Sequence, residues 1–337
     1  MRIITCASYH GTGSSAISDL FSEFDAVGSL GIYEYRFLQD PNGISDLEFH
    51  VVQNNHRHNT SDAIKQFKRY VHLLSQNWYA RGYQKAFGNQ FESISNEYIM
   101  SITQLYTKSW WHMDQIERGR LFCFLDKVYS RLKRMILGEL KTEKIYSFLQ
   151  NREYGYFTSI DETEFLFHTK NYINKLFSYA NKGNKNYLMV DQLIPPTNIE
   201  RYLRYFDDVK VIVVDRDPRD IYILEKTQWK WGVIPTSSVS EYVDWFKITR
   251  HRNTVAEDPE KILRIRFEDM VYKYDETRKR LIEFVGLDIA SHTRPRSFFN
   301  PAISIANTNL AASCHEFKED ISYIEKQLPE FIYDFPE

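Results

Sequence analysis

The sequence predicts an α/β protein of three layers, in which helices flank a parallel central β-sheet. Three features predict this class. An apolar segment at 3–8 leads through a glycine-containing turn into an amphipathic helix, an almost continuous apolar run lies at 209–214, and a third strand–helix unit occupies 263–285. Strands that alternate with helices form a parallel sheet covered on both faces. Ligands of such sheets bind at the carboxyl ends of the strands, so a site is expected there.

The first unit contains the strand, the turn and a helix predicted over residues 14–24. Gly28 follows this helix as a stop signal, a second strand is expected over Ile32–Phe37, and a turn is expected at 40–43. The helix is predicted from apolar residues that recur at helical spacing: Ala16, Ile17, Leu20, Phe21 and Phe24.

Residues 45–180 differ in composition, because they contain few Gly or Pro and many Tyr, Phe, Lys and Asn. We interpret them as a helical insertion that covers one end of the sheet. The chain shows no clean linker and no internal repeat, so residues 1–337 are expected to form a single domain. Helical periodicity is present over 62–78, 97–106, 117–138 and 163–181.

The sheet is expected to resume after the insertion. Tyr187–Val190 predicts one strand, and the run at 209–214 predicts a central parallel strand because only Lys210 interrupts it. A further strand is expected at 263–267, followed by a helix over 275–285 that ends at a glycine.

The composition excludes several classes of protein. The net charge of −2 provides no global field for nucleic acid or an anionic membrane. No run of eighteen apolar residues is present, so no transmembrane segment is expected. The three cysteines are widely spaced and form no metal or redox motif, which favours reduced thiols, a cytoplasmic location and no bound metal. The sequence does not indicate the oligomeric state.

The turn at 11–16 is the strongest local signal for a ligand. A glycine-hydroxyl turn that opens a helix directs backbone N–H groups and the positive end of the helix dipole at one point, where an anion binds. A plain turn capped by Ser14 is the alternative. A P-loop nucleoside triphosphatase would need the lysine of GxxxxGK, which is absent. A Rossmann dinucleotide site stays open, because 11–16 fits GxGxxA and Glu34 lies about twenty residues further on.

Two later segments resemble conserved blocks of the sulfotransferases. Residues 209–223 are similar to their 3′-phosphate strand and loop, with Arg216 in Asp-Arg-Asp-Pro, and 263–287 are similar to their later strand–helix unit. Together with the opening turn, three blocks occur in the correct order over most of the chain. The resemblance implies a P-loop-like sulfotransferase fold. Similar architecture occurs in bacterial enzymes that sulfate cell-surface polysaccharides and in Golgi heparan sulfotransferases.

The resemblance implies 3′-phosphoadenosine 5′-phosphosulfate (PAPS) as the sulfuryl donor and adenosine 3′,5′-bisphosphate as the product, with no metal. Arg216 would hold the 3′-phosphate, for which its planar fork is suited. The alternative for Arg216 is an ion pair with a neighbouring aspartate. The 5′-phosphosulfate would lie on the five residues of the turn, which are Gly11, Thr12, Gly13, Ser14 and Ser15.

The sequence departs from the family pattern at two positions. Gly11 stands where many members have Lys or Arg, and His10 and Arg36 are candidates for the missing cation. Leu224 replaces the usual serine eight residues after the 3′-phosphate arginine, and Thr227 or Arg219 are candidates to compensate.

Two residues are candidates for the catalytic base. Glu34 lies in Tyr-Glu-Tyr-Arg-Phe, which is similar to the second-strand context of the catalytic glutamate in Golgi heparan sulfotransferases. We expect it to be partly buried and to take the proton of an acceptor hydroxyl. A surface or ion-paired glutamate is the alternative. His10 is the second candidate, against the alternative of a hydrogen-bonded structural histidine.

The implied function is transfer of a sulfuryl group from PAPS to a carbohydrate hydroxyl by in-line displacement. Two other functions stay open: a Rossmann NAD(P)-binding oxidoreductase, and a non-catalytic descendant that binds nucleotide or glycan. Five tryptophans are candidate sugar platforms, with core or shell packing as the alternative: Trp78, Trp110, Trp111, Trp229 and Trp231.

Overall fold

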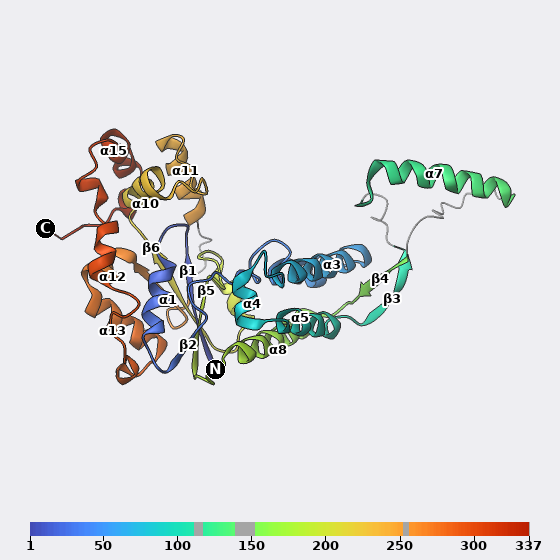
Figure 1. The fold of residues 1–337 in the computed structure, drawn as a ribbon, viewed down its shortest axis with the longest axis horizontal. Helices are drawn as coiled ribbons and strands as arrows, with labels where there is room; N and C mark the ends of the chain where they lie inside the picture. Colours follow the sequence, from blue (N-terminus) through green and yellow to red (C-terminus); the bar gives the residue numbers. More distant parts are fainter. Residues whose placement is uncertain (111–116, 139–151, 252–255, 337) are drawn as a thin grey trace.

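The structure is a computed structural model that describes residues 1–110, 117–138, 152–251 and 256–336. In these residues the main sheet has five strands, all parallel, in the order β2-β5-β1-β6-β7 (Figure 1). The strands are β1 (Arg2–Ser8), β2 (Val27–Ser29), β5 (Tyr187–Asp191), β6 (Val209–Asp215) and β7 (Ile262–Arg266).

Both faces of this sheet are covered, which confirms the predicted three-layer class. Alternate side chains of β1 point to opposite faces, as strand geometry requires. Ile4 and Cys6 pack on one face with α1 (Ser14–Ser22), α12 (Phe267–Tyr272) and α13 (Tyr274–Val285). Ile3 and Ala7 pack on the other face against helices from the middle of the chain. Strands buried on two faces explain the apolar run in β6.

The segment between Asp40 and Leu203 supplies that second layer. It contains the helices α2 (Ile44–Glu48), α3 (Arg57–Leu74), α4 (Arg81–Phe87), α5 (Gln90–Ser101), α8 (Glu162–Ala180) and α9 (Ile199–Leu203), with a π-helix at Phe49–Gln53. Further from the sheet lie an antiparallel ribbon of β3 (Leu105–Trp110) and β4 (Arg152–Phe157), and α7 (Gly119–Ile136) (Figure 1).

Two predicted elements are wrong. The helix expected over 97–106 is the end of α5 followed by β3, because residues 105–110 pair with β4, a distant partner that local periodicity does not reveal. The second strand is β2 at 27–29, whereas 32–37 is irregular. Gly31 adopts φ +79°, and Tyr35 and Phe37 then turn into an aromatic cluster with Tyr83.

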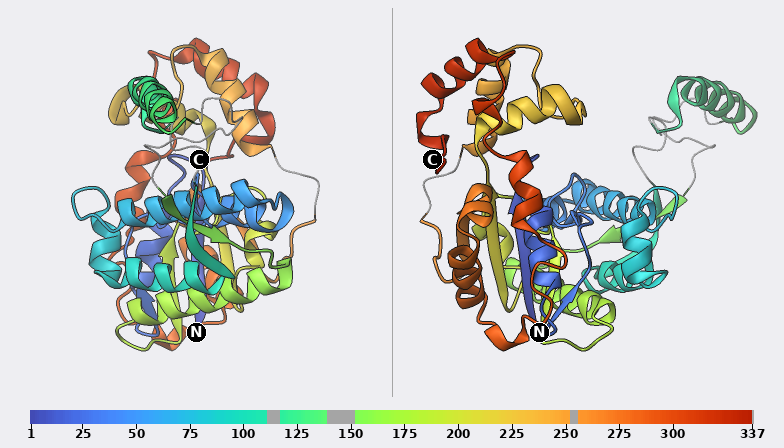
Figure 2. Two further views of the ribbon diagram at one scale, coloured as in Figure 1. Left: turned by 90° about the vertical axis from the view of Figure 1, so that its right-hand side faces the viewer. Right: turned by 60° about the vertical axis from the view of Figure 1, so that its left-hand side comes forward.

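Helices from the C-terminal third of the chain cover the carboxyl ends of the strands. A cluster of α10 (Pro218–Leu224), α11 (Val239–Arg250) and α15 (Lys318–Gln327) lies at the end of the sheet opposite the N-terminus in both views of Figure 2. A π-helix at Glu225–Trp229 continues α10, and α14 (Pro301–Ser304) follows α13. Short 3₁₀ turns occupy 289–291, 305–307, 310–312 and 329–331.

Candidate functional site

The loop between β1 and α1 needs glycine at two positions. Gly11 has φ +75° and Gly13 has φ +100°, conformations that other residues rarely adopt. A Cβ on Gly11 would lie 2.5 Å from the Trp229 ring, and one on Gly13 would lie 2.6 Å from the Phe267 ring. Dihedral angle and packing therefore exclude larger residues at both positions.

Thr12 holds this loop to the sheet. Its buried hydroxyl lies 2.9 Å from the Tyr9 carbonyl and 2.8 Å from the Val214 carbonyl, to which it can donate. The sequence predicts Thr12 as a hydroxyl donor to a ligand. In the structure this hydroxyl is engaged by the ends of β1 and β6, so its role in the loop is structural.

The N-terminus of α1 is an electropositive end without a side-chain cap. Gly13 is its N-cap residue, no acidic residue occupies its first turn, and its first amide N–H groups have no acceptor within the helix. The Ser14 hydroxyl donates to Asp191 Oδ2 at 3.1 Å. Burial, and then the nearby Glu34 carboxylate, raise the pKa of Asp191 well above its usual range. This shift favours the protonated form of the carboxyl beside the helix end.

Arg216 directly follows β6 and is 4% exposed. One guanidinium nitrogen donates to the Gly11 carbonyl at 3.2 Å, and another donates to the Asn307 carbonyl. The guanidinium carbon lies 4.7 Å from the centre of the Phe267 ring. Within the described residues Arg216 Nε has no hydrogen-bond partner. Burial lowers the pKa of the guanidinium, which nevertheless stays charged at neutral pH.

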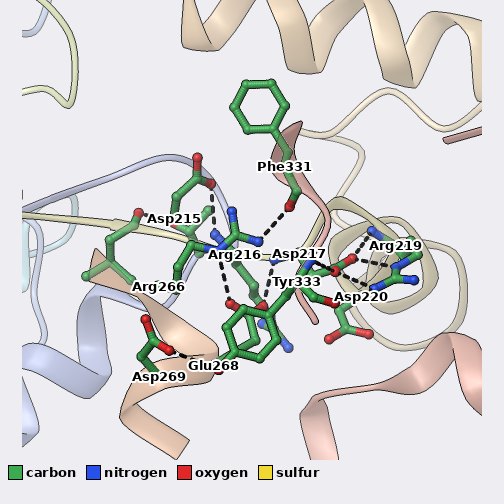
Figure 3. A network of polar contacts seen from close by, with 12 residues as sticks. Asp215, Arg216, Asp217, Arg219, Asp220, Arg266, Glu268, Asp269, Phe331 and Tyr333 are labelled. Atoms are coloured by element: carbon green, nitrogen blue, oxygen red, sulfur yellow. Dashed lines mark hydrogen bonds and ion pairs between the residues drawn. The ribbon is translucent and has the colours of Figure 1, made fainter. Parts of the chain in front are cut away.

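The aspartates beside Arg216 are paired with other groups, as Figure 3 shows in part. Asp215 pairs with Arg250 at 2.7 Å, and Asp217 pairs with Arg219 at 2.8 Å. In the portion of the chain described, no carboxylate lies within 4.0 Å of the Arg216 guanidinium nitrogens, so the structure does not show the alternative of an aspartate ion pair.

One cavity of about 660 Å³ opens at the carboxyl ends of β1, β5 and β6. Its volume is in the range of small-molecule sites. Of the eight predicted site residues, Thr12 alone does not line it. The lining therefore brings together seven residues that the sequence singles out: His10, Gly11, Gly13, Ser14, Ser15, Glu34 and Arg216.

Glu34 is more exposed than the sequence analysis expects. Its side chain is 49% exposed because the irregular 32–37 segment leaves it at the cavity surface. Its carboxylate lies 3.6 Å from Arg36 Nη1, and Arg36 Nε donates to Asp40 at 2.9 Å. Burial, and then the charge of Arg36, lower the pKa of His10. His10 is therefore a neutral imidazole at neutral pH, and Arg36 is the stronger candidate for the missing cation.

The two residues expected to replace the family serine do not line the cavity. The Thr227 hydroxyl donates to the Ile223 carbonyl at 2.7 Å, and Arg219 is held by Asp217 and Glu325. Leu224 is buried in the protein. The cavity instead receives polar groups that carry no sequence motif, and these come from Asn300, Ser304 and Asn307.

Two of the five candidate tryptophans line the cavity. Trp229 and Trp231 stack with ring centres 5.0 Å apart and an angle of 8° between their planes. Trp78 is exposed and does not line it. Trp111 and the side chain of Trp110 lie outside the described part of the structure.

Two classes of feature are absent from the described residues. They contain no group of three or more His, Cys, Asp or Glu side chains arranged to hold a metal ion. None of the helices described combines the length and the apolar character needed to cross a bilayer.

The strand order argues against the Rossmann fold, which the sequence leaves open beside the sulfotransferase fold. A Rossmann sheet places its second strand directly beside its first. Here β5 lies between β1 and β2, so the order does not match, and Glu34 lies beyond the end of β2.

Comparisons with known proteins agree with the resemblance. A model described as the sulfotransferase family matches residues 140–291, which include β5, β6 and β7 but not the opening loop. The match confirms the predicted resemblance to this family over residues 140–291. No curated protein sequence matches the chain.

Several solved structures are similar to this chain at low identity. The sulfotransferase domain of the Synechococcus PCC 7002 olefin synthase is 13% identical, covers 99% of this chain and 95% of its own, and has a TM-score of 0.42. The sulfotransferase domain from the curacin biosynthetic pathway is 14% identical, with 99% coverage of both chains and a TM-score of 0.41. Retinol dehydratase, in complex with androsterone and the inactive cofactor PAP, is 13% identical, with coverages of 100% and 84% and a TM-score of 0.31.

Proposed function

We propose that this chain, whose residues 140–291 match the sulfotransferase family, transfers a sulfuryl group from PAPS to a hydroxyl group of a carbohydrate. The observation that carries the proposal is a cavity lined by two groups that bind anions. One is the uncapped N-terminus of α1, and the other is the buried cation Arg216. PAPS has anionic groups at its 5′ and 3′ positions, so one donor molecule would satisfy both.

The residues present fit such a donor. Arg216 has a buried Nε without a partner among the described residues, and both of its hydrogen bonds go to carbonyl oxygens. The carboxylates of Asp220, Glu268 and Asp217 act on it only through space. A buried guanidinium without a directly paired anion is costly, so an anionic ligand would stabilise this arrangement. The N–H groups of Gly13, Ser14 and Ser15 would hold the 5′ end, and Arg216 would hold the 3′-phosphate.

The transfer requires a proton acceptor and stabilisation of the leaving group. The acceptor oxygen attacks sulfur in line, the bond between sulfur and the bridging oxygen breaks, and adenosine 3′,5′-bisphosphate departs. The α1 N-terminus and Arg36 would stabilise the charge that develops on the departing oxygen. The proton of the acceptor hydroxyl would pass to Glu34.

Glu34 is our proposed base because its carboxylate lines the cavity and is accessible. His10 is the second candidate, since its lowered pKa leaves it neutral and able to accept a proton. Both residues line the same cavity, which supports either as the base.

The segment that carries Glu34 is supported by the helical layer. The Tyr35 hydroxyl donates to the Gly82 carbonyl at 3.2 Å, and the Phe37 N–H donates to the Tyr83 hydroxyl at 3.2 Å. The described residues that line the cavity come from outside 45–180. We therefore propose that this insertion shapes the acceptor site indirectly, by holding residues 33–37 in place.

A carbohydrate acceptor is supported by an aromatic surface at the cavity. Trp231 is exposed, stacks on Trp229 and lines the cavity, an arrangement that offers a flat face to a sugar ring. Polar side chains such as Gln39 and Asn300 line the same cavity and would bind hydroxyl groups. By analogy with the sulfotransferases that the sequence resembles, we propose a cell-surface polysaccharide or glycan and a cytoplasmic enzyme.

The test combines turnover with ligand binding. The chain is incubated with ³⁵S-labelled PAPS and a panel of polysaccharides, with long-chain alcohols as non-carbohydrate acceptors, and calorimetry measures the affinity for adenosine 3′,5′-bisphosphate and for NADH. We expect bisphosphate binding and label transfer to a glycan. Label transfer only to the alcohols would reject the carbohydrate acceptor. Bisphosphate binding without any transfer would instead indicate a non-catalytic descendant, and NADH binding without bisphosphate binding an oxidoreductase.

A further inference from the structure

Helix α7 presents its apolar side chains to solvent. It lies beyond the β3–β4 ribbon and away from the main sheet in Figure 1 and in the right-hand view of Figure 2. At 100° per residue, seven exposed apolar residues fall within an arc of roughly 120°. Ile136 is 84% exposed, for example, and Leu121 is 72% exposed. The seven are Leu121, Phe124, Leu125, Val128, Leu132, Met135 and Ile136.

A surface helix normally buries its apolar face and exposes its polar face, whereas α7 does the opposite. Asp126 and Ser130, which lie on the opposite face, are buried, whereas the apolar face is open. Contiguous exposed apolar surface of this kind marks an interaction site. The exposed face is therefore a surface that needs a partner.

Charge indicates which partner. Five basic residues and one acidic residue lie between Gly119 and Ile136, so α7 carries a net charge of +4 while the whole chain carries −2. By helical geometry Arg120 and Arg131 border one edge of the apolar face, and Lys133 lies near the other edge. Basic residues beside a wide apolar face are typical of helices that lie in the interface of an anionic bilayer.

We propose that α7 binds the surface of an anionic lipid bilayer. The apolar face would enter the headgroup and acyl boundary, while the basic residues at its edges would contact lipid phosphates. An 18-residue helix with these charges does not suit a transmembrane path. A second copy of α7 is a less suitable partner, because the basic edges would repel each other and the acidic Asp126 lies on the opposite face.

The proposal is independent of sulfuryl transfer and can fail without affecting it. The test is flotation of the full-length chain with vesicles of phosphatidylcholine alone or with 30% phosphatidylglycerol. We expect binding to the anionic vesicles, weak binding to the neutral ones, and release as salt rises from 50 to 500 mM.

Two variants test the two parts of the surface. Phe124→Glu should weaken binding to the anionic vesicles by at least about tenfold, because it removes buried apolar area and adds a negative charge. Arg120→Gln with Arg131→Gln should weaken it by roughly 10- to 30-fold, since each basic residue near the surface adds about fivefold. Phe167→Glu is the matched control. Phe167 on α8 is 62% exposed, compared with 63% for Phe124, and its substitution should leave vesicle binding unchanged.

Three results would overturn the proposal. They are no binding of the unchanged chain to anionic vesicles, equal loss of binding in Phe124→Glu and Phe167→Glu, and self-association that Phe124→Glu abolishes while vesicles stay unbound. Circular dichroism of each variant shows that the fold is retained, and the retained binding of adenosine 3′,5′-bisphosphate provides a second check.

Discussion

Arg216 is the residue that most directly tests the assignment of the donor site. Replacement by Ala should weaken the binding of adenosine 3′,5′-bisphosphate by about 1.5–3 kcal/mol, because a charge-assisted hydrogen bond to phosphate is lost. Arg216→Lys keeps the charge but loses the fork, so the loss of affinity should be smaller. Isothermal titration calorimetry measures both.

A neighbouring arginine provides the control for Arg216. Arg250 is 6% exposed and pairs with Asp215, but it does not line the cavity. Arg250→Lys should therefore leave the affinity for the bisphosphate almost unchanged. Unaltered affinity in both Arg216 variants, with their fold intact, would refute the role of this residue.

Glu34 is the residue on which the proposed chemistry depends. Glu34→Gln should lower kcat by roughly 10²-fold while the affinity for the donor is kept, because the carboxamide cannot accept the proton. Asp40→Asn is the matched control, since it also removes a carboxylate from Arg36 but lies outside the cavity lining. A similar loss of kcat in both variants would assign the effect to Arg36, and near-normal turnover of Glu34→Gln would transfer the base role to His10.

Among single residues, those that could be predicted as site residues are the ones whose type requires a ligand or a special backbone conformation. Gly11, Gly13 and Arg216 are such residues. Asn307 could not be predicted as a neighbour of the site, because nothing local distinguishes it from other polar residues. Its proximity follows from the folding of a distant segment onto the end of β6.

At the scale of elements, the opening loop depends on two glycines. Gly13→Ala combines a positive φ with a Cβ 2.6 Å from Phe267, so we expect loss of bisphosphate binding and a decrease in stability of more than about 1 kcal/mol. Gly31 has a φ of +79°, but a Cβ added there would have no atom within 4 Å. Gly31→Ala therefore measures the cost of the backbone conformation alone. Thermal unfolding and calorimetry compare them, and equal behaviour of the two variants would contradict the packing argument.

The loop after β6 and the start of α12 share a buried carboxyl that titrates near neutrality. Glu268 accepts the Asp217 N–H at 2.6 Å, and burial raises the pKa of Glu268 from its ordinary value of 4.5 to about 7 (Figure 3). A raised carboxyl pKa stabilises the fold fully below pH 4.5, and this contribution is lost as pH rises through 7.

Glu268→Gln removes this titration while keeping an acceptor for the Asp217 N–H. The stability advantage of the unchanged chain over this variant should therefore fall by up to about 3 kcal/mol between pH 4.5 and 8. Urea denaturation at several pH values measures the difference. An advantage that does not change with pH would show that Glu268 does not titrate in this window.

Elements with strong local patterns could be predicted from the sequence, and elements that depend on distant pairing could not. The apolar run of β6 and the periodicity of α8 and α13 are examples of the first kind. The β3–β4 ribbon is an example of the second, because each strand needs a partner across the intervening α7. The segment at 32–37 has a strand-like composition, but aromatic packing overrides it.

At the scale of the whole molecule, the sheet order brings the opening loop beside a strand end about 200 residues away. β6 pairs directly with β1, so Arg216 lies against the Gly11 carbonyl. Parallel topology and the family resemblance predict this juxtaposition from the sequence. The predicted α/β class and the resemblance to the sulfotransferases are confirmed, whereas the donor and the acceptor are proposals.

The most direct test of the central claim is a crystal structure of the chain with adenosine 3′,5′-bisphosphate. The account predicts that one molecule spans the cavity, with its 5′-phosphate on the N–H groups of residues 13–15 and its 3′-phosphate within about 3 Å of the Arg216 guanidinium. A bisphosphate bound elsewhere, or one that contacts only one of these two groups, would contradict it.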